Sequence, residues 1–491
     1  MSSLDILFVA AEVAPFAKTG GLADVSAALP RHLARAGHRV RLVMPLYGRV
    51  HAKAEALTPH PDLQDLELEL GGRSLRFSVE TAPLPGSDLD VWFLRCDELY
   101  GGDEIYTERE DEHVRFALLA AAGFRIAQQL GWSPDIVHLN DWHTALAPLF
   151  LKSQLAWDRL FEKTKTVLTI HNIGYQGVFP SSVAEEIGFG DQTELFHRED
   201  FADGTLNFLK TGVLYADALT TVSRTYAREI QTPEFGAGLE ELLRERSESL
   251  VGIVNGVDYA EWNPATDAAL PVNYDAASLE KKLANKQHLC KRFGLDLPTL
   301  TEEAPGPLLF GVVSRLTGQK GFELLPDILP VLLREADARL VVLGSGEERY
   351  ERYFQWLRDA FPDRVAVFKG YSEELSHQIE AGSDAFLMPS RYEPCGLNQM
   401  YSLKYGTVPI VRRTGGLADT VEDYDAVTGE GTGFVFDEFS PEALLHALRR
   451  ALHVWKDLYA WRRIVRAGME RDFSWTHQGA EYEALYDKLR S

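Results

Sequence analysis

The sequence predicts an α/β protein with two Rossmann-like, doubly wound domains that face a cleft. Two series of short apolar runs alternate with longer amphipathic stretches, which is the pattern of parallel sheets covered by helices. The length of 491 residues exceeds that of one ordinary hydrophobic core. The hexapeptide Thr-Gly-Gly-Leu-Ala-Asp occurs at Thr19–Asp24 and again at Thr414–Asp419, each time where a strand-like run turns into a helix-like one. Two such turns indicate two halves that act on one ligand.

The first series of apolar runs predicts the parallel sheet of an N-terminal domain, residues 1–255. Its expected strands are Ile6–Ala11, Val40–Met44, Val91–Leu94, Ile136–Leu139, Thr166–Ile170 and Ala218–Val222. The region 56–81 differs, because its leucines alternate with polar residues around Leu66–Leu70 and the Gly71-Gly72 turn follows. This pattern predicts a small antiparallel insertion.

The second series begins after Pro307 and predicts a C-terminal domain, residues 256–475. Its expected strands are Leu308–Val313, Leu340–Leu343, Val365–Phe368, Ala385–Met388, Val408–Val411 and Gly433–Phe436. Four prolines between positions 264 and 305 place the domain junction near Asn255–Pro264. The last stretch, residues 476–491, has a helical pattern.

Composition excludes several classes of partner. The net charge of −23 repels nucleic acids and anionic membranes, and no apolar run approaches the length of a membrane span. Asp5 and Glu12 flank the first apolar run, which therefore resembles a buried strand more than a signal sequence. The three cysteines are far apart, without the spacing of a zinc site. We expect a cytoplasmic protein with no metal and no nucleic-acid or membrane partner.

Polar residues follow the expected strands of the first half, at the sheet edge where doubly wound proteins bind ligands. Lys18 precedes the first Gly-Gly turn, so a cation would lie beside free helix N–H groups, as a phosphate site requires. Asp141 and His143 follow one strand, and His171 and Asn172 follow the next. A helix N-cap is the ordinary alternative for Asp141 and is compatible with ligand contact. For His171 the alternative is a hydrogen-bonded loop histidine, but its place after a strand end favours a ligand.

In the second half, Arg315 and Lys320 follow the first strand and are expected at the start of a helix. Cations normally avoid a helix N-terminus, so this placement predicts a compensating anion, most simply a diphosphate. Surface solubility is the alternative explanation for both residues.

The most specific stretch is Pro389–Leu397, which again follows a strand and precedes a helix. Glu393 within it could accept hydrogen bonds from sugar hydroxyls, or could serve as a helix-start charge. Cys395 is expected to pack rather than to act as a nucleophile, because no histidine is paired with it in sequence.

Taken together, six motifs in this order resemble the family of bacterial glycogen synthases and plant starch synthases. They are Lys18–Asp24, Asp141–His143, His171–Gly177, Ser314–Gly321, Glu393–Leu397 and Arg412–Asp419. The resemblance implies the GT-B architecture and retaining transfer of glucose from ADP-glucose to the non-reducing end of an α-1,4-glucan, which elongates glycogen. It also implies that no metal or cofactor takes part, and that the C-terminal helix returns to the N-terminal domain.

The resemblance further implies roles for individual residues. The expected catalytic residues are Asp141, His171, Arg315, Lys320 and Glu393. The expected substrate-binding residues are Lys18, Gly20, Gly21, Tyr100, His143, Asn172, Tyr371, Cys395, Gly396, Leu397, Thr414, Gly415 and Gly416. Arg315 and Lys320 would hold the diphosphate, and His171 would contact the transferring glucose. Tyr371 would stack near the adenine, and Tyr100 would lie close to the reaction site.

One position departs from the wider GT-B pattern, in which a second glutamate eight residues after the first binds the donor ribose. Here that position is Tyr401. Among enzymes, transfer from UDP-glucose or to another acceptor stays open, as does a nucleotide-sugar epimerase or hydrolase. A non-catalytic glucan-binding protein is disfavoured because the charged residues are retained, and a phosphorylase because no lysine is marked for a pyridoxal cofactor. Since no second carboxylate lies beside Glu393 in sequence, we expect front-face transfer without a covalent intermediate.

Overall fold

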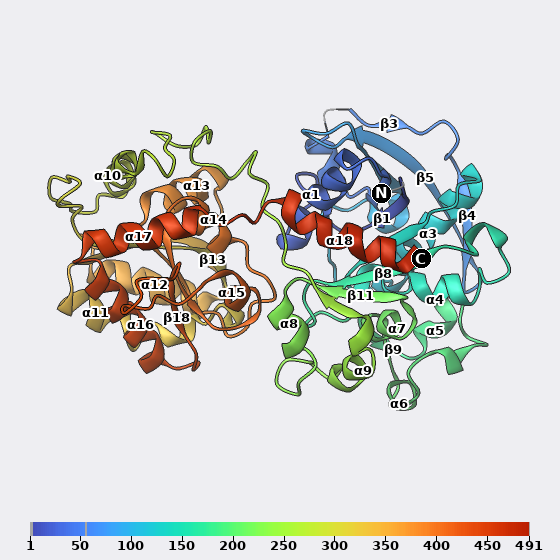
Figure 1. Cartoon of the computed structure of the whole chain (residues 1–491). Coiled ribbons are helices and arrows are strands. Elements are labelled where there is room, and N and C mark those ends of the chain that lie inside the picture. The colour runs from blue at the N-terminus through green and yellow to red at the C-terminus, as the bar shows by residue number, and fades with distance from the viewer. Residues whose placement is uncertain (1–2, 55, 491) are drawn as a thin grey trace. The chain divides into compact units, whose positions relative to one another are not determined.

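The computed structural model describes residues 3–54 and 56–490. The chain forms two compact units, Met1–Gly256 together with Trp475–Ser491, and Val257–Ser474 (Figure 1). Each unit is built around its own sheet, as the two series of apolar runs predict. Within the described part of the chain, no helix is both long and apolar enough to cross a membrane.

The N-terminal unit contains a sheet whose strand order is β12-β11-β8-β7-β1-β2-β6-β5-β3, with β4 paired to β5. Its strands β12 to β6 in this order run parallel, and β1 lies between β2 and β7. Every strand expected from the first series is present. The bounds are β1 Asp5–Val9, β2 Arg39–Pro45, β3 Thr58–Pro59, β4 Leu66–Leu70, β5 Arg73–Pro83, β6 Asp90–Arg95, β7 Ile136–Asn140, β8 Lys165–Ile170, β11 Ala218–Thr221 and β12 Leu250–Gly252.

The predicted antiparallel insertion is confirmed. Strands β4 and β5 pair antiparallel around the Gly71-Gly72 turn, and both glycines have positive φ, 55° and 79°. Strand β5 also pairs antiparallel with β6 and so joins the insertion to the main sheet. A separate ribbon of β9 (Val178–Pro180) and β10 (Thr205–Asn207) was not predicted, because its strands are too short to show a periodic pattern.

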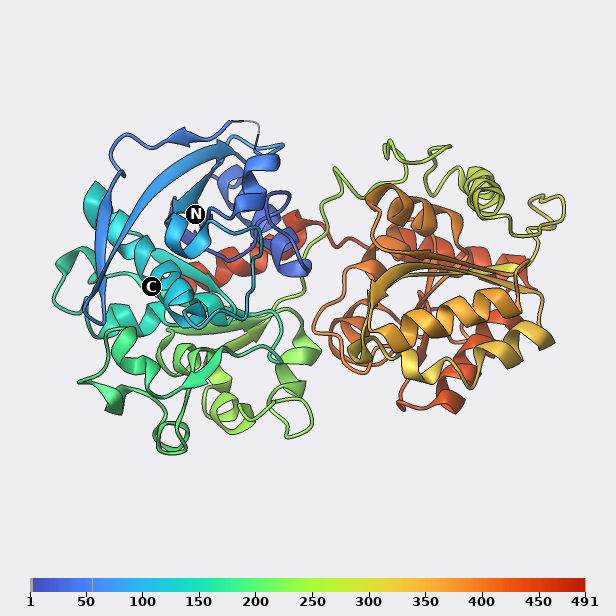
Figure 2. The ribbon, with the colours of Figure 1, turned by 180° about the vertical axis from the view of Figure 1, so that it is seen from behind.

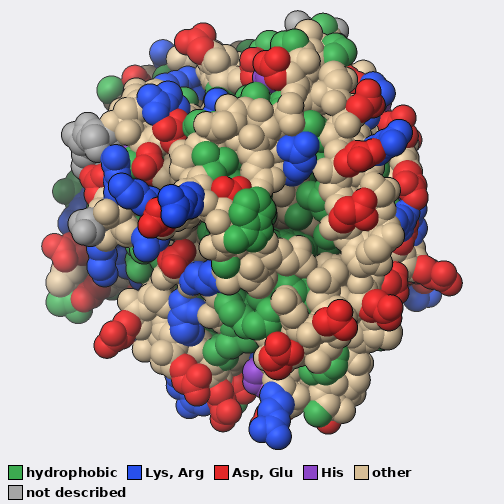
Figure 3. All heavy atoms as spheres, turned by 90° about the vertical axis from the view of Figure 1, so that its right-hand side faces the viewer, with side chains coloured by type: hydrophobic (Ala, Val, Ile, Leu, Met, Phe, Trp, Pro, Cys, Tyr) green, Lys and Arg blue, Asp and Glu red, His purple; other side chains and the backbone are tan. Residues whose placement is uncertain are grey.

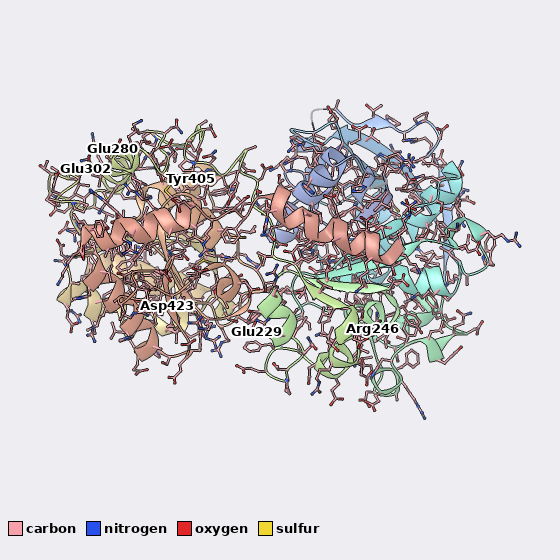
Figure 4. All side chains as sticks on the ribbon, in the orientation of Figure 1. Glu229, Arg246, Glu280, Glu302, Tyr405 and Asp423 are labelled. Atoms are coloured by element: carbon pink, nitrogen blue, oxygen red, sulfur yellow. The ribbon has the colours of Figure 1, made fainter. Side chains whose placement is uncertain are left out.

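Helices complete the N-terminal unit on both sides of its sheet (Figure 2). Their bounds are α1 Gly21–Arg35, α2 Asp97–Tyr100, α3 Glu112–Leu130, α4 Ala147–Lys152, α5 Val183–Glu186, α6 Arg198–Ala202, α7 Phe208–Tyr215, α8 Arg224–Glu229, α9 Glu240–Glu245 and α18 Trp475–Arg490. Arg246, labelled in Figure 4, donates to the Val213, Leu214 and Ala216 carbonyls and so neutralises the C-terminal end of α7.

The C-terminal helix α18 packs on the N-terminal unit, against α1. His32 on α1 lies 2.8 Å from Glu483 on α18, and His138 on β7 lies 2.5 Å from the Tyr486 hydroxyl. Gly479 allows the close approach, because a Cβ there would lie 2.2 Å from the His32 ring.

On the face of this unit in Figure 3, acidic and basic side chains are interspersed, so that face presents no continuous basic surface.

The C-terminal unit contains a six-stranded parallel sheet of order β15-β14-β13-β16-β17-β18. Its strands are β13 Leu308–Leu316, β14 Ala338–Gly346, β15 Val365–Lys369, β16 Ala385–Met388, β17 Val408–Arg412 and β18 Phe434–Phe436. Its helices are α10 Lys282–Phe293, α11 Leu329–Glu335, α12 Glu348–Ala360, α13 Glu373–Gly382, α14 Asn398–Lys404, α15 Gly415–Thr420, α16 Pro441–Val454 and α17 Leu458–Met469.

Alternate residues of β13 belong to two different hydrophobic clusters. Leu308 and Phe310 pack with residues of α11, α12, α16 and α17, whereas Leu309 packs with residues of α10 and α13. Successive side chains of a strand point to opposite faces, so the sheet is covered on both sides. This is the doubly wound arrangement that the sequence predicts.

Candidate active site

In the N-terminal unit, polar residues converge at the carboxyl ends of β1, β7 and β8, which are neighbours in the sheet. Asp141 comes directly after β7 with φ +55° and ψ −173°. Non-glycine residues are uncommon at positive φ, and such backbone strain often marks a functional site. The conformation turns the Asp141 carboxylate toward the end of β8.

The Asp141 carboxylate joins two strand ends. Its Oδ1 accepts hydrogen bonds from the backbone N–H groups of His171 at 2.7 Å and Asn172 at 3.3 Å. Asp141 occupies the N-cap position of the turn Trp142–Thr144, as its ordinary alternative predicts, but its side chain makes no capping hydrogen bond there. Burial, opposed by these two hydrogen bonds, raises the pKa of Asp141 to about 7.

The buried His171 ring has a defined tautomer. Its Nε2 lies 2.9 Å from Asn140 Oδ1, and the Asn140 amide nitrogen donates to the Val9 carbonyl at 3.0 Å. Since the Asn140 oxygen is thereby the acceptor, Nε2 carries the proton and Nδ1 is left as an acceptor. Burial lowers the pKa of His171 to about 3, which keeps the ring neutral. A neutral imidazole with a fixed acceptor nitrogen suits contact with a sugar hydroxyl.

His143 and Asn172 lie at the same edge. The His143 ring is buried and stacks on Tyr106 with centroids 4.8 Å apart, and its burial lowers its pKa well below the usual value. Asn172 is half-buried, and its side chain accepts from the Gly174 N–H at 3.0 Å. Tyr106 was missed by the sequence reasoning, because it lies in a loop without a motif and reaches His143 only through the fold.

The first Gly-Gly turn is exposed and leads into α1. Lys18 forms an ion pair with Asp24 at 2.6 Å, and Gly20 is the N-cap of the helix. A Cβ placed on Gly20 would meet no atom within 4 Å, so space around this turn is open on the protein side. The Glu12 carboxylate accepts hydrogen bonds from the Thr19 N–H and hydroxyl of this turn. Glu12 is 2% exposed and was not singled out as a site residue from sequence. A glutamate directly after the apolar run Ile6–Ala11 was the available signal.

Tyr100 does not lie at this edge as a free side chain. Its ring is fully buried, and its hydroxyl donates to the Arg115 carbonyl at 2.6 Å. The ring also packs edge-on against Tyr47. In this conformation the residue has a packing role, because both its ring and its hydroxyl are engaged within the protein.

In the C-terminal unit, Lys320 and Glu393 form an ion pair at the carboxyl ends of β13 and β16. The Lys320 Nζ lies 2.6 Å from Glu393 Oε2, and the Ser390 hydroxyl donates to the same oxygen at 2.9 Å. The Glu393 side chain is 6% exposed and that of Lys320 is 20% exposed. A buried carboxylate therefore holds a more accessible ammonium group at the sheet edge.

The expected helix after Arg315 is wrong. Strand β13 continues to Leu316, so Arg315 is an exposed strand residue, and only short 3₁₀ turns follow at Gly318–Lys320 and Phe322–Leu324. Gly321 with φ +72° separates the two turns, and α11 begins only at Leu329. A helix dipole therefore does not explain the placement of Arg315 and Lys320, although both remain at the sheet edge.

The second Gly-Gly turn accommodates the backbone of the Glu393–Cys395 segment. A Cβ on Gly415 would lie 1.9 Å from the Glu393 carbonyl oxygen, and one on Gly416 would lie 2.0 Å from the Cys395 carbonyl oxygen. The Gly416 N–H also donates to the Glu393 carbonyl at 3.0 Å. Gly415 and Gly416 therefore position the Glu393–Cys395 segment, whereas no protein atom occupies the corresponding space beside Gly20. Thr414, the N-cap residue of α15, is fully buried.

Of the remaining expected residues of this unit, three lie in the same loop, and Tyr371 follows the edge strand β15. Cys395 is buried and reduced, Gly396 has φ +72°, and Leu397 is the N-cap residue of α14. Tyr371 follows β15 and is 67% exposed. Tyr401, which replaces the ribose-binding glutamate of the wider pattern, lies flat on Trp262 with ring centroids 3.8 Å apart.

One cluster elsewhere has the composition of a metal site. Glu261, Glu373 and His377 each place a potential ligand atom within 4.8 Å of the other two. His377 is also hydrogen bonded at 2.7 Å to Asp267, which accepts from Tyr405 (labelled in Figure 4) at 2.6 Å. Both glutamates are exposed, and exposed acidic groups commonly gather without an ion, so we assign no metal to this cluster.

Comparison with known proteins agrees with this architecture. The family described as "Starch synthase catalytic domain" matches residues 5–245, and that described as "Glycosyl transferases group 1" matches residues 301–467. The chain is 46% identical to the glycogen synthase of Anaeromyxobacter sp. (strain Fw109-5) over 486 residues, which cover 99% of each chain. It is 43% identical to the glycogen synthase of Thermotoga maritima over 488 residues, again 99% of each.

A solved structure extends the likeness to three dimensions. The catalytic domain of starch synthase IV from Arabidopsis thaliana, bound to ADP and acarbose, matches with a TM-score of 0.89 at 34% identity and covers 100% of both chains. The two parallel-sheet units and the full-length matches lead to one conclusion. The chain belongs to the family of bacterial glycogen synthases and plant starch synthases, which are glycosyltransferases of the GT-B fold.

Proposed function

We propose that this chain transfers glucose from ADP-glucose to the non-reducing end of an α-1,4-glucan with retention of configuration, and so elongates glycogen in the cytoplasm. The observation that carries the proposal is the Lys320–Glu393 pair, because it presents a preplaced cation at a sheet edge of the C-terminal unit. The Arabidopsis relative, at 34% identity over its whole length, is described as bound to ADP and acarbose, which supports a nucleotide donor and a glucan acceptor.

In this proposal the C-terminal unit binds the nucleotide sugar. Arg315 and the Lys320 ammonium interact with the diphosphate, and negative charge that grows on the leaving phosphate is stabilised there. Glu393 orients Lys320 and offers its remaining oxygen to a sugar hydroxyl. Gly415 and Gly416 fix the backbone of the glutamate segment, and the Tyr371 ring, which is 67% exposed, would stack on the base.

The N-terminal unit provides the groups for the transferring glucose and the acceptor. His171 offers a neutral Nδ1 and Asp141 a carboxylate that titrates near neutral pH. Lys18 and the open Gly20-Gly21 turn would contact the donor phosphates or sugar. The departing diphosphate would accept the proton of the incoming hydroxyl, so that no glucosyl-enzyme forms.

The proposal is tested by incubating the purified protein with glycogen and either ADP-glucose or UDP-glucose, while nucleotide release and glucan extension are followed together. We expect both signals to rise in equal amounts, and faster with ADP-glucose. Nucleotide release without extension would indicate a hydrolase or another acceptor. Extension that is faster with UDP-glucose would contradict the donor assignment but keep the reaction class.

A further inference from the structure

Glu12 lies at the centre of a hydrogen-bond network beside the strand-end residues of the N-terminal unit. It follows β1, which pairs with β7 in register Val9 to Leu139, so Glu12 and Asp141 come from adjacent strand ends. The Glu12 carboxylate accepts from the Thr19 N–H at 2.5 Å, from the Thr19 hydroxyl at 2.6 Å and from the Tyr106 hydroxyl.

The Glu12 carboxylate is buried, and the Lys18–Gly21 turn to which it is hydrogen bonded is exposed. Glu12 is 2% exposed, whereas Lys18, Thr19 and Gly21 are exposed. Three hydrogen-bond donors are directed at this one carboxylate. Burial and the Glu12 charge raise the pKa of Tyr106, so its hydroxyl remains a donor.

Tyr106 extends the network to the segment that carries Asp141. Its ring stacks on His143 at 4.8 Å with an interplanar angle of 21°. A single carboxylate thus connects the Lys18–Gly21 turn on one side with the segment Asp141–His143 on the other. A shift of the Lys18–Gly21 turn would break charge-assisted hydrogen bonds to Glu12, and a shift of the Asp141–His143 segment would disturb the stacking of His143 on Tyr106.

We propose that Glu12 is a positioning residue for glucosyl transfer, which sets the geometry of the Lys18–Gly21 turn through Thr19 and that of the Asp141–His143 segment through Tyr106. This inference rests on the proposed function, because the reaction that these elements serve is the one proposed above. Glu12 acts through its neighbours and makes no contact with substrate in this account.

The charge of Glu12 has a second effect, on the ionisation of Asp141. The ionisable groups around Asp141 are Glu12, Tyr106 and His171, with His143 in its own segment. Tyr106 and both histidines are neutral, and the Arg115 charge helps to lower the pKa of His143. The Glu12 charge therefore adds to burial in raising the pKa of Asp141.

The test compares Glu12→Gln, Glu12→Asp and Tyr106→Phe with a matched control, Glu80→Gln. Glu80 is a similarly buried glutamate of the same unit, bound to Arg95 at 2.8 Å on the antiparallel part of the sheet. We expect Glu12→Gln to lower kcat by about a hundredfold, the loss that a misplacement of about 1 Å can cause. We expect Glu80→Gln to keep the kcat of the unmodified chain.

The pH profile separates positioning from a general loss of stability. Glu12→Gln removes the negative charge that raises the pKa of Asp141, so the acid limb of the pH profile of kcat/KM should move to lower pH. Glu12→Asp and Tyr106→Phe keep this charge, so their acid limb should stay at the pH of the unmodified chain. An unchanged acid limb and a kcat within about twofold of the unmodified chain in Glu12→Gln would overturn the proposal.

The pKa of Asp141 can be measured without an activity assay. This measurement therefore tests the role of Glu12 separately from the proposed function. Carboxyl carbon NMR titration, with Asp141→Asn to assign the signal, reports the pKa of Asp141 directly. We expect a lower value in Glu12→Gln than in the unmodified chain, whatever reaction the protein performs. Equal values in the two proteins would contradict the coupling even if glucan extension is confirmed.

Discussion

The Lys320 ammonium nitrogen lies 2.6 Å from the buried carboxylate of Glu393, which is 73 positions later in the chain. The Gly415-Gly416 turn contacts the backbone of the segment that carries Glu393 and so fixes the position of its side chain. A cation held in place before substrate binds needs no reorganisation when charge develops on a leaving group. This pair is therefore the part of the C-terminal unit that we expect to contribute most to turnover.

Replacing the cations at this edge should slow the reaction strongly. We expect Lys320→Ala and Arg315→Ala each to lower kcat by about a hundred- to a thousandfold, the usual effect of removing one preorganised group. Arg449→Ala is a suitable control, because Arg449 is an exposed arginine paired with Glu335 on the helical surface of the same unit. Near-normal turnover with unchanged donor affinity in both site variants would contradict the assignment.

The pair should also behave as one unit. Because Lys320 and Glu393 contact each other directly, the losses in Lys320→Ala and Glu393→Gln should not add in the double variant. We expect the double variant to lose little more activity than the worse of the two single variants. Steady-state kinetics of all four proteins completes the cycle, and strictly multiplicative losses would show that the two side chains act independently.

The two Gly-Gly turns should respond differently to alanine. A Cβ on Gly416 collides with the Cys395 carbonyl, so Gly416→Ala should reduce stability by about 1–3 kcal/mol or more and lower activity with it. A Cβ on Gly20 meets no protein atom, so Gly20→Ala should keep the thermal midpoint while activity falls through contact with the ligand. Thermal unfolding and kcat measured on both variants test this, and a destabilised Gly20→Ala protein would refute it.

Acid should destabilise the N-terminal unit through its buried histidines. Burial lowers the pKa of His138 and of His171 to about 3, from 6.5. The folded state therefore binds fewer protons than the unfolded chain in this range, and stability present above pH 6.5 is lost as the pH falls toward 3. Urea unfolding at a series of pH values should show this decline, with a weaker dependence in His138→Gln. Stability that stays constant from pH 7 to 4 would contradict the neutral burial.

The attachment of α18 can be tested at Gly479. A Cβ there would lie within 2.4 Å of two atoms of the His32 ring, which forms the 2.8 Å contact with Glu483. We expect Gly479→Ala to lower the thermal midpoint by several degrees, as overpacking of about 1–3 kcal/mol does. Gly102→Ala is the control, because a Cβ at that glycine meets nothing within 4 Å. Equal midpoints for the two variants would argue against tight packing of α18.

The sequence predicts the strands well because buried parallel strands are short apolar runs, as Ile136–Leu139 and Val408–Val411 show. It also places Asp141, His171, Lys320 and Glu393 after strand ends. Which of them touch is a tertiary property: no local pattern pairs Lys320 with Glu393. The helix expected after Arg315 fails because Gly321 adopts a positive φ and breaks the run.

Loop residues were the hardest to find. Tyr106 has no periodic neighbours, and its contacts with Glu12 and His143 exist only once α3 packs against β1 and the Trp142–Thr144 turn. Tyr100, six residues earlier, matched the family pattern but is engaged in the core.

The most direct test of retaining glucosyl transfer uses ADP-glucose labelled with carbon-13 at the anomeric carbon, a maltooligosaccharide acceptor and carbon NMR of the products. We expect the label to appear in an α-1,4 linkage at the non-reducing end, in an amount equal to the ADP released. Label found as free glucose, or in a β linkage, would contradict retaining transfer to a glucan.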